Sequence, residues 1–210
     1  MHVNIGNCNS EELYAIIEKE NPEIIFEETD IWRKKDEYYI KGLYKKQRSC
    51  TLETATIMRY LENNDIIHIP VDTYELPIAP PDIYTDISNA CEDYEITVKN
   101  NFILSYQNGF SYINSDECSI ELDKILEIEV KTIERLGKQK LMEKYKLWRS
   151  ITDKRDNEML KNIYDYSQKH KYTNAVFIVG AEHKKSILKK IVDFDQRYKT
   201  KINWKSWRIT

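Results

Sequence analysis

A run of five apolar residues near the C-terminal end constrains the fold of this chain more than any other stretch. Residues 175–179 read AVFIV, and their β-branched and aromatic types, with no polar interruption, predict a strand that is buried on both faces. Gly180 follows directly, then Glu182, His183 and a helix-like run over residues 184–194. A strand, a glycine turn and a helix in this order are typical of α/β folds, which place polar side chains at the carboxyl ends of their strands.

Three other segments change in the same way from an apolar run to polar residues. They are residues 3–6, 24–26 and 66–71. Helical patterns separate the strands, so we expect a three-layer α/β fold with a mostly parallel sheet, whose strand ends share one edge. In chain order the polar residues at these ends are Asn7, Cys8 and Asn9; Glu27 and Glu28; Asp72; and Glu182 with His183.

Two helices in the first part of the chain are marked by their caps. Asn9, with Glu12 three residues later, forms a capping box that predicts a helix through about residue 20. Thr51 is an N-cap for a second helix through about residue 63. His68 lies inside the apolar run of the next strand, where a histidine is more often a satisfied core residue than a ligand.

The middle of the chain is mainly helical in pattern. Apolar residues recur at helical spacing over residues 116–170, with one skip around Gly137. In residues 95–115 we expect a hairpin that turns near Gly109. The chain of 210 residues is therefore predicted to be one domain, with a helical insertion over residues 80–170 before its last core strand.

Charge is divided unevenly along the chain. Residues 1–130 contain 11 Lys and Arg against 26 Asp and Glu, a net charge of −15, whereas residues 131–210 contain 21 against 9, a net charge of +12. This polarity indicates either a basic surface for nucleic acid or two halves of one fold that attract each other. The basic tail with Trp204 and Trp207 leaves a similar choice, between stacking on bases and packing as a last strand. We favour attraction and packing, since solvated helix faces carry most of these charges.

The chain lacks the sequence marks of membrane and secreted proteins. No run reaches the roughly 18 consecutive apolar residues that span a bilayer, and no signal-like region precedes the first strand. The four cysteines are widely spaced without a C-x-x-C pair, which argues against a structural zinc site and for reduced thiols. These features predict a cytoplasmic protein with no membrane partner.

Acidic groups that crowd at one sheet edge repel one another and lose solvation. Their pKa values then rise, or they recruit a cation such as a metal ion, Lys or Arg. Glu28, Asp72 and His183 could together hold Mn²⁺, Co²⁺ or Zn²⁺ and activate its bound water. The same side chains could also work without a metal, with His183 or a glutamate as general base on a water.

Four short motifs occur in order along the chain. They are GNCN at residues 6–9, NPEIIFEETDIWR at 21–33, KRDNEM at 154–159 and FIVGAEH at 177–183. They resemble the motifs of the TraB/PrgY–Tiki–ChaN–erythromycin-esterase superfamily, namely a G-x-x-H loop, a kPDvvfvELDxxR segment, an ERDxxM helix and a vvvGaaHxxgi strand and turn. Their order and separations fit, and together they extend over most of the chain.

The resemblance implies an EreA/ChaN-like fold and a site built from Glu28, Arg33, Asp72, Arg155 and His183, with Glu28 and His183 as the central pair. Arg155 would hold a carboxylate of the site or of the substrate, because guanidinium binds carboxylates in bidentate fashion. Family members include metal-dependent peptidases, esterases, a haem-binding protein and pheromone-shutdown proteins, so the fold alone does not settle a function. We expect a hydrolase that acts on a peptide, ester or lactone bond of a small molecule or peptide, with or without a metal ion.

The chain departs from the family at the first motif, where Asn9 stands in place of the histidine. Asparagine has no titratable nitrogen and is a poor metal ligand. Either Asn9 is only an N-cap and catalysis depends on His183, or the site binds a ligand without reacting. Cys8 could act as ligand or nucleophile, or pack as a small buried thiol. The residues expected to contact a substrate are Asn9, Cys8, Glu27, Asp72 and Glu182. A nucleic-acid-associated protein is the third alternative.

Overall fold

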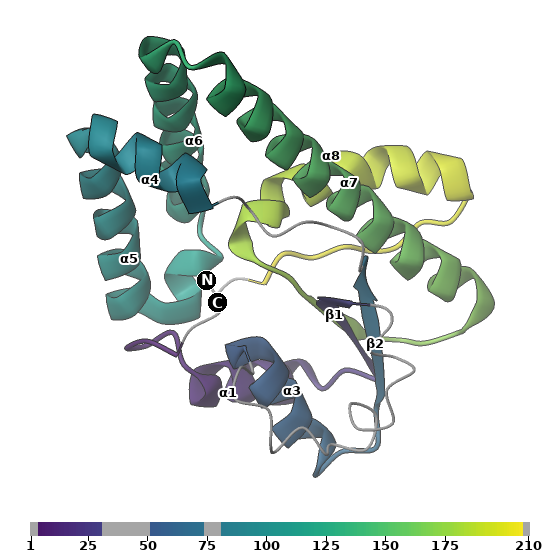
Figure 1. Cartoon of the computed structure of the whole chain (residues 1–210). Helices are drawn as coiled ribbons and strands as arrows, with labels where there is room; N and C mark the ends of the chain where they lie inside the picture. Colours follow the sequence, from purple (N-terminus) through teal and green to yellow (C-terminus); the bar gives the residue numbers. More distant parts are fainter. Residues whose placement is uncertain (1–3, 31–50, 74–80, 208–210) are drawn as a thin grey trace.

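The computed structural model describes residues 4–30, 51–73 and 81–207. Within these residues the chain is mostly helical and contains one small sheet of three parallel strands. The strands are β1 (Ile24–Asp30), β2 (Ile67–Asp72) and β3 (Ala175–Ile178), in the spatial order β2-β1-β3 (Figure 1). The described helices are α1 (Ser10–Glu20), α3 (Leu52–Leu61), α4 (Pro81–Ala90), α5 (Glu92–Ile113), α6 (Asp116–Leu136), α7 (Gln139–Lys169) and α8 (Ala181–Tyr198).

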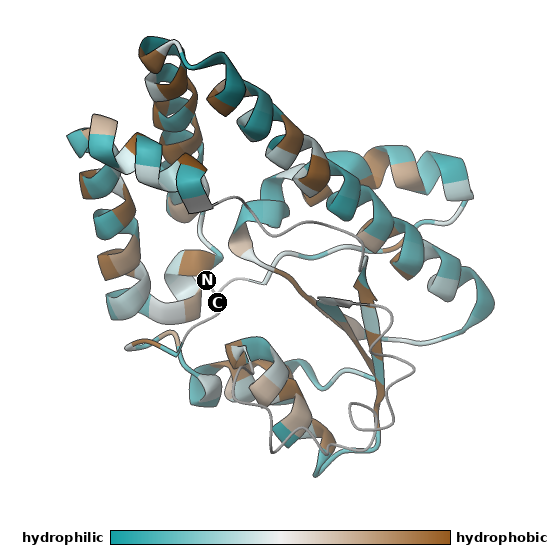
Figure 2. Ribbon diagram, viewed as in Figure 1, coloured by the Kyte–Doolittle hydropathy of each residue, from teal (hydrophilic) through white to brown (hydrophobic). Residues whose placement is uncertain are grey.

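β1 is the central strand because its residues pair on both sides. Ile24 lies opposite Ile67 of β2 and Ala175 of β3, and both parallel registers continue over the next three residues of β1. Ile24, Ile25 and Phe26 of β1 are apolar and buried, which is typical of a strand with a neighbour on each side, whereas residues 27–30 of the same strand are polar. The apolar residues of the strands are brown in Figure 2, but all four residues of β3 are only partly buried, so the prediction of a strand buried on both faces is wrong for β3.

The two faces of β1 contact different helices. Ile24 and Phe26 pack in a buried cluster with side chains of α7 and α8. Ile25 packs in another cluster, with side chains of α1 and α3. Successive residues of a strand point to opposite faces, so Glu27 and Glu28 continue this alternation toward the end of β1.

The expected first strand is not part of this sheet. Ile5 forms an isolated antiparallel bridge with Cys8, because Gly6 (φ 46°) turns the chain back on itself. The backbone N–H of Asn7 donates to the carbonyl of Tyr106 at 2.9 Å, which holds the turn against α5. The prediction of a parallel strand before α1 is therefore wrong for the described residues. The turn and α5 take up backbone groups that a sheet would have used.

The two predicted N-caps begin α1 and α3. Asn9 Oδ1 accepts a first-turn N–H of α1 at 3.0 Å, and Thr51 Oγ1 accepts a first-turn N–H of α3 at 3.2 Å. α6 ends at Gly137, whose left-handed conformation (φ 62°) costs a glycine little. The helical pattern predicted over residues 116–170 is confirmed as α6 and α7, and their junction lies at the predicted skip.

The prediction of a hairpin over residues 95–115 is wrong. These residues lie mainly in α5, a helix that contains one non-helical residue, Gly109 (φ 56°, ψ −142°). The buried positions of α5 are mostly small or polar residues, such as Thr97 and Ser105, with Tyr112 as the large exception. An inward face of this kind gives no apolar repeat at helical spacing, and the β-branched residues around it favour a strand. Packing against α6 and the N-terminal turn decides for the helix.

α7 packs its C-terminal half against the sheet. Met159 and Leu160, in its C-terminal half, are completely buried in the cluster that covers one face of β1 and β2. The side-chain amide of Asn162 donates to the carbonyl of Val71 at 2.8 Å, which fixes α7 against β2. Residues 81–169 are therefore almost entirely helical, as predicted, and the last of their helices continues into the core, whereas the division of the chain into a domain with an insertion stays a prediction.

The basic tail after α8 packs against the sheet. Nε1 of Trp204 donates to the hydroxyl of Tyr164 at 3.2 Å, and the Trp204 ring contacts the ring of Phe177 in β3 edge to face. The described tail residues, 199–207, contain no strand. The prediction of a packed tail is confirmed for Trp204, whereas the prediction of a last strand is wrong, because side chains rather than a backbone ladder make the contact.

Ion pairs join the acidic and basic halves of the chain. Nζ of Lys138 lies 3.1 Å from Oδ1 of Asp86, and Lys185 pairs with Asp123. These contacts agree with the interpretation that the two halves attract each other. Exposed pairs of this kind contribute only about 0 to 1 kcal/mol each, so they orient the halves more than they stabilise them.

No helix in the described residues has the length and apolar character that crossing a membrane requires. Cys8, Cys91 and Cys118 are free thiols. Burial raises the pKa of Cys8 to about 11, so its thiol stays protonated at neutral pH.

Candidate functional site

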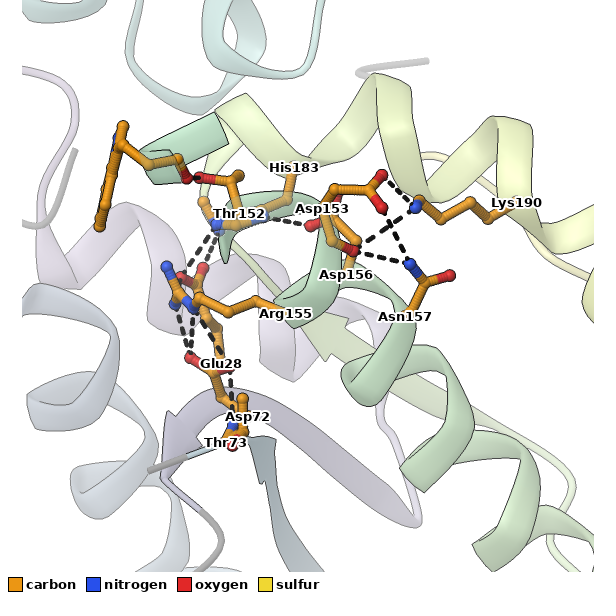
Figure 3. Close-up of polar contacts among 12 residues, drawn as sticks. Glu28, Asp72, Thr73, Thr152, Asp153, Arg155, Asp156, Asn157, His183 and Lys190 are labelled. Atoms are coloured by element: carbon orange, nitrogen blue, oxygen red, sulfur yellow. Dashed lines mark hydrogen bonds and ion pairs between the residues drawn. The ribbon is translucent and has the colours of Figure 1, made fainter. Parts of the chain in front are cut away.

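Charged side chains from four elements meet at the carboxyl edge of the sheet. Figure 3 shows how they point toward one another, and we call this set the edge network. It brings together the described residues that the family resemblance indicated, and it adds one more acid. The members are Glu28 of β1, Asp72 of β2, Arg155 and Asp156 of α7, and His183 of α8.

Arg155 lies at the centre of the edge network. Its Nε donates to the two oxygens of Asp72 at 3.2 and 3.0 Å, and its Nη2 lies 2.5 Å from Oδ2 of Asp72 and 2.5 Å from Oε1 of Glu28. Nη1 makes no hydrogen bond within the described part of the chain, and 20 % of the side chain is exposed. Two carboxylates therefore hold the guanidinium from one side, while its other N–H groups stay accessible.

Both carboxylate oxygens of Glu28 have partners. Oε1 contacts Arg155 and lies 3.2 Å from Nε2 of His183, and Oε2 accepts the backbone N–H of Gly180 at 2.6 Å. Gly180 lies between β3 and α8, so a single carboxylate ties β1 to α7 and to the start of α8. The side chain of Glu28 is 8 % exposed, and a buried carboxylate needs such partners to stay charged.

His183 is held by a carboxylate at each ring nitrogen. Nδ1 contacts Oδ1 of Asp156, and Nε2 faces Glu28. Asp156 is almost completely buried, and the imidazole is nearly so. Two acceptors of this kind favour the imidazolium form, which donates from both nitrogens.

The pKa values of Glu28 and His183 follow from these contacts. Burial lowers the pKa of His183, but the hydrogen bonds and negative charges of Asp156 and Glu28 outweigh burial and raise it to about 9. Burial raises the pKa of Glu28, but the hydrogen bond and charge of His183, the N–H of Gly180 and the charge of Arg155 together lower it to about 2. At neutral pH the two side chains therefore form an ion pair.

Local structure explains why these side chains meet. Glu28 lies on the face of β1 that packs against α7 and α8. Arg155 and Asp156 precede the buried residue Met159 by about one helical turn, which places them just beyond the sheet edge. His183 lies in the first turn of α8, because that helix begins directly after the short β3 and Gly180.

Asp156 is the member of the edge network to which sequence reasoning assigned no role. It lies in the KRDNEM segment beside Arg155. Positions 152, 156, 159, 160 and 163 share one face of a helix, and all of them are buried in α7. A carboxylate on a buried helix face needs a partner. The position of Asp156 on the apolar face of a predicted helix could therefore have indicated its role from the sequence.

Glu27 lies on the opposite face of β1 from Glu28. Its Oε1 accepts the hydroxyl of Thr54 at 2.7 Å, and its Oε2 lies 2.8 Å from Nε2 of His68. The prediction that His68 is a satisfied core histidine is confirmed, since its side chain is 8 % exposed and paired. Glu27 therefore links the sheet to α3 and does not join the edge network.

The other predicted site residues lie outside the edge network. Asn9 caps α1, and its Nδ2 donates to the carbonyl of Gly6 at 2.8 Å. Cys8 is buried in the turn before α1. Glu182 is exposed in the first turn of α8, and within the described residues it has no hydrogen bond to the network. Arg33 lies outside the described residues.

The edge network holds the guanidinium of Arg155 where the sequence predicted a divalent metal ion. Arg155 lies between Glu28 and Asp72 and pairs with both. Both ring nitrogens of His183 face carboxylates. Over the parts of the chain that the structure describes, no group of three or more His, Cys, Asp or Glu is arranged to hold a metal ion. These side chains therefore do not form a site for Mn²⁺, Co²⁺ or Zn²⁺ in the arrangement observed.

Comparison with known proteins identifies no relative of this chain. No family model, no curated protein and no solved structure matches it. The likeness to the TraB/PrgY–Tiki–ChaN–erythromycin-esterase superfamily rests on the four sequence motifs. Membership of that superfamily therefore stays a prediction.

Proposed function

We propose that the edge network is the acid–base site of a hydrolase that cleaves a peptide, ester or lactone bond. The observation that carries this proposal is the continuous series of contacts from Asp156 through His183 to Glu28, beside an arginine with accessible N–H groups. His183 is the general acid, Glu28 the general base, and Arg155 polarises the substrate carbonyl. The family resemblance supports the same roles. The three-layer arrangement belongs to the proposal as well, supported by the different helices that contact the two faces of β1.

The resting network must open before it reacts. With a pKa of about 2, Glu28 is too weak a base to take a proton from water. For Glu28 to act as a base, the guanidinium of Arg155 and the imidazole of His183 must move away from its carboxylate when a substrate carbonyl binds the accessible N–H groups of Arg155. Loss of these partners raises the pKa of Glu28, because burial is then no longer compensated.

Once Arg155 and His183 have moved away from Glu28, hydrolysis takes three proton transfers. Glu28 takes a proton from a water molecule as the water oxygen attacks the carbonyl carbon. His183 gives its Nε2 proton to the leaving oxygen or nitrogen as that atom separates from the carbon. When Glu28 and His183 return to contact, at 3.2 Å in the resting site, the proton passes from the glutamic acid to the imidazole. One water is consumed, and both side chains regain their starting charges.

A hydrolysis screen tests the proposal. The substrates are 4-nitrophenyl esters, γ- and δ-lactones, and a mixture of short peptides. We expect turnover of at least one class by the wild type, and a loss of kcat/KM by roughly 10² to 10⁴ in Glu28→Gln and in His183→Gln. Activity should fall as the pH rises through about 9, where His183 loses the proton that it must donate. Turnover that both variants retain would refute the assignment.

The opposite face of β1 offers a matched control. Glu27 and His68 form a carboxylate–imidazole pair with similar burial and a similar contact distance. If Glu27→Gln and His68→Gln remain folded by circular dichroism, they should keep the kcat/KM of the wild type. An equal loss of activity in these variants would mean that activity needs any buried carboxylate–imidazole pair of the sheet. The assignment of catalysis to the edge network would then be refuted.

A non-catalytic ligand-binding protein is the second candidate. It is favoured because each oxygen of Glu28 and each nitrogen of His183 already has a partner, while Asn9 serves only as a cap where the family has a histidine. Arg155 would then hold an anionic group of the ligand. A carboxylate compound that raises the melting temperature of the wild type but not of Arg155→Lys, without being turned over, would support this candidate.

A further inference from the structure

α5 exposes large apolar side chains along much of its length. They are 38 to 53 % exposed, and Figure 2 shows brown segments on α5 at the left edge of the molecule. Residues four or seven positions apart share one side of a helix, so these side chains form a continuous strip. We call the strip the α5 face, and it consists of Ile96, Val98, Phe102, Ile103 and Tyr106. An exposed apolar strip of this kind is a candidate interaction surface.

The α5 face lies in an acidic part of the molecule. Residues 81–136, which span α4 to α6, contain 12 Asp and Glu against four Lys and Arg, a net charge of −8. Three of these acids, Glu92, Asp93 and Glu95, lie in the first turn of α5. Two α5 faces in contact would bring two such regions together, which like-charge repulsion disfavours. The fitting partner combines exposed apolar side chains with positive charge.

The chain itself carries a surface of that description on α8. Leu188 and Val192 are 45 and 59 % exposed and lie one helical turn apart. Lys189 is exposed beside Leu188 on the same helix. Residues 181–207 contain eight Lys and Arg against three Asp and Glu, a net charge of +5. We call Leu188, Lys189 and Val192 the α8 face.

We propose that the α5 face of one copy of this chain docks on the α8 face of a second copy. The apolar side chains leave water on contact, and the opposite net charges select this pairing over α5 with α5 or α8 with α8. α5 and α8 lie at different ends of the view in Figure 1, so one copy uses two separate surfaces. An assembly of any length keeps one unoccupied α5 face at one end and one unoccupied α8 face at the other. The contact therefore builds linear chains, or rings where these two ends meet.

Sedimentation velocity and light scattering test the proposal. At roughly 10 to 500 µM protein we expect species larger than the 25.1 kDa monomer, with dissociation as NaCl rises from about 0.05 to about 0.5 M. Phe102→Ser with Ile103→Ser removes the α5 face, and Leu188→Ser with Val192→Ser removes the α8 face. All four residues are exposed, so both variants should fold. Ile67→Thr, at an exposed apolar residue of β2, is the control that should associate like the wild type.

Mixing the two double variants gives the sharpest outcome. Each double variant alone should be monomeric, because one of its two faces is missing. Their equimolar mixture should form a dimer and nothing larger, since the intact α8 face of one variant meets the intact α5 face of the other. A wild type that stays monomeric over this range, a mixture that stays monomeric, or association that strengthens with salt would each overturn the proposal.

Discussion

Replacing Asp156 by Asn tests whether the edge network sets the charge of His183. Asp156 is the partner of Nδ1 of the buried imidazole, and the amide keeps nearly the same shape without the negative charge. An opposite charge at contact distance shifts a pKa by about 1 to 3 units. We therefore expect Asp156→Asn to lower the pKa of His183 from about 9 to between about 6 and 8.

The change should also alter how stability depends on pH. In the folded protein the pKa of His183 is about 9, above the ordinary value of 6.5, so protonation of His183 stabilises the fold. This contribution is fully present below pH 6.5 and is lost as the pH rises through 9. It amounts to roughly 3 kcal/mol, since one pKa unit corresponds to about 1.4 kcal/mol. In Asp156→Asn the free energy of unfolding should vary much less over this pH range.

Two measurements check the result, and a neighbouring acid provides the control. The imidazole signals are titrated by NMR, and urea unfolding is measured at several pH values between 6 and 9.5. Asp153 lies one turn before Asp156 on α7, but its side chain is 62 % exposed and pairs with Lys190 at the surface. Asp153→Asn should leave both profiles unchanged. If His183 still titrates near pH 9 in Asp156→Asn, or if the control flattens the profile equally, the reasoning is refuted.

Three further predictions concern single residues. Asn9 caps α1, so in urea titrations Asn9→Ala should lower the free energy of unfolding by about 1 kcal/mol, whereas Asn9→Asp should leave it nearly unchanged. Equal effects of the two substitutions would contradict the capping role. Gly109→Ala should destabilise far more than Gly137→Ala in thermal melts. Both residues have positive φ, but a Cβ at Gly109 would lie 2.4 Å from the backbone oxygen of Asn7, whereas the space around Gly137 is open. Glu28 has a pKa of about 2 against an ordinary 4.5, so it contributes stability that is present above pH 4.5 and lost as the pH falls through 2. Glu28→Gln should therefore show a flatter melting temperature between pH 5 and 2, and an unchanged acid profile would count against this account of Glu28.

The sequence by itself determined the elements whose signals are local. Asn9 and Thr51 mark helix starts because an N-cap depends only on the few residues that follow it. The apolar runs of residues 24–26, 66–71 and 175–179 predicted the three strands of the sheet. A continuous apolar run is the common pattern of strands in a parallel sheet, so these strands could be recognised without knowledge of their neighbours.

Part of the edge network could be predicted in the same way. Parallel strands bring their carboxyl ends to one edge, and this rule was enough to bring Glu28, Asp72 and His183 together. Arg155 was indicated only by the family resemblance. Asp156 was missed because its role depends on the rotation of α7, which the contacts of that helix with β2 set.

Tertiary structure alone decided the remaining features. Glu27 and Glu28 are adjacent acids, yet only the face that α7 and α8 cover makes Glu28 part of the network. α5 is a helix despite a strand-like sequence, and the residues before α1 turn against α5 instead of entering the sheet. In each case the energies of alternative local conformations differ little. Contacts between residues distant in sequence then select one conformation, and no local pattern records them.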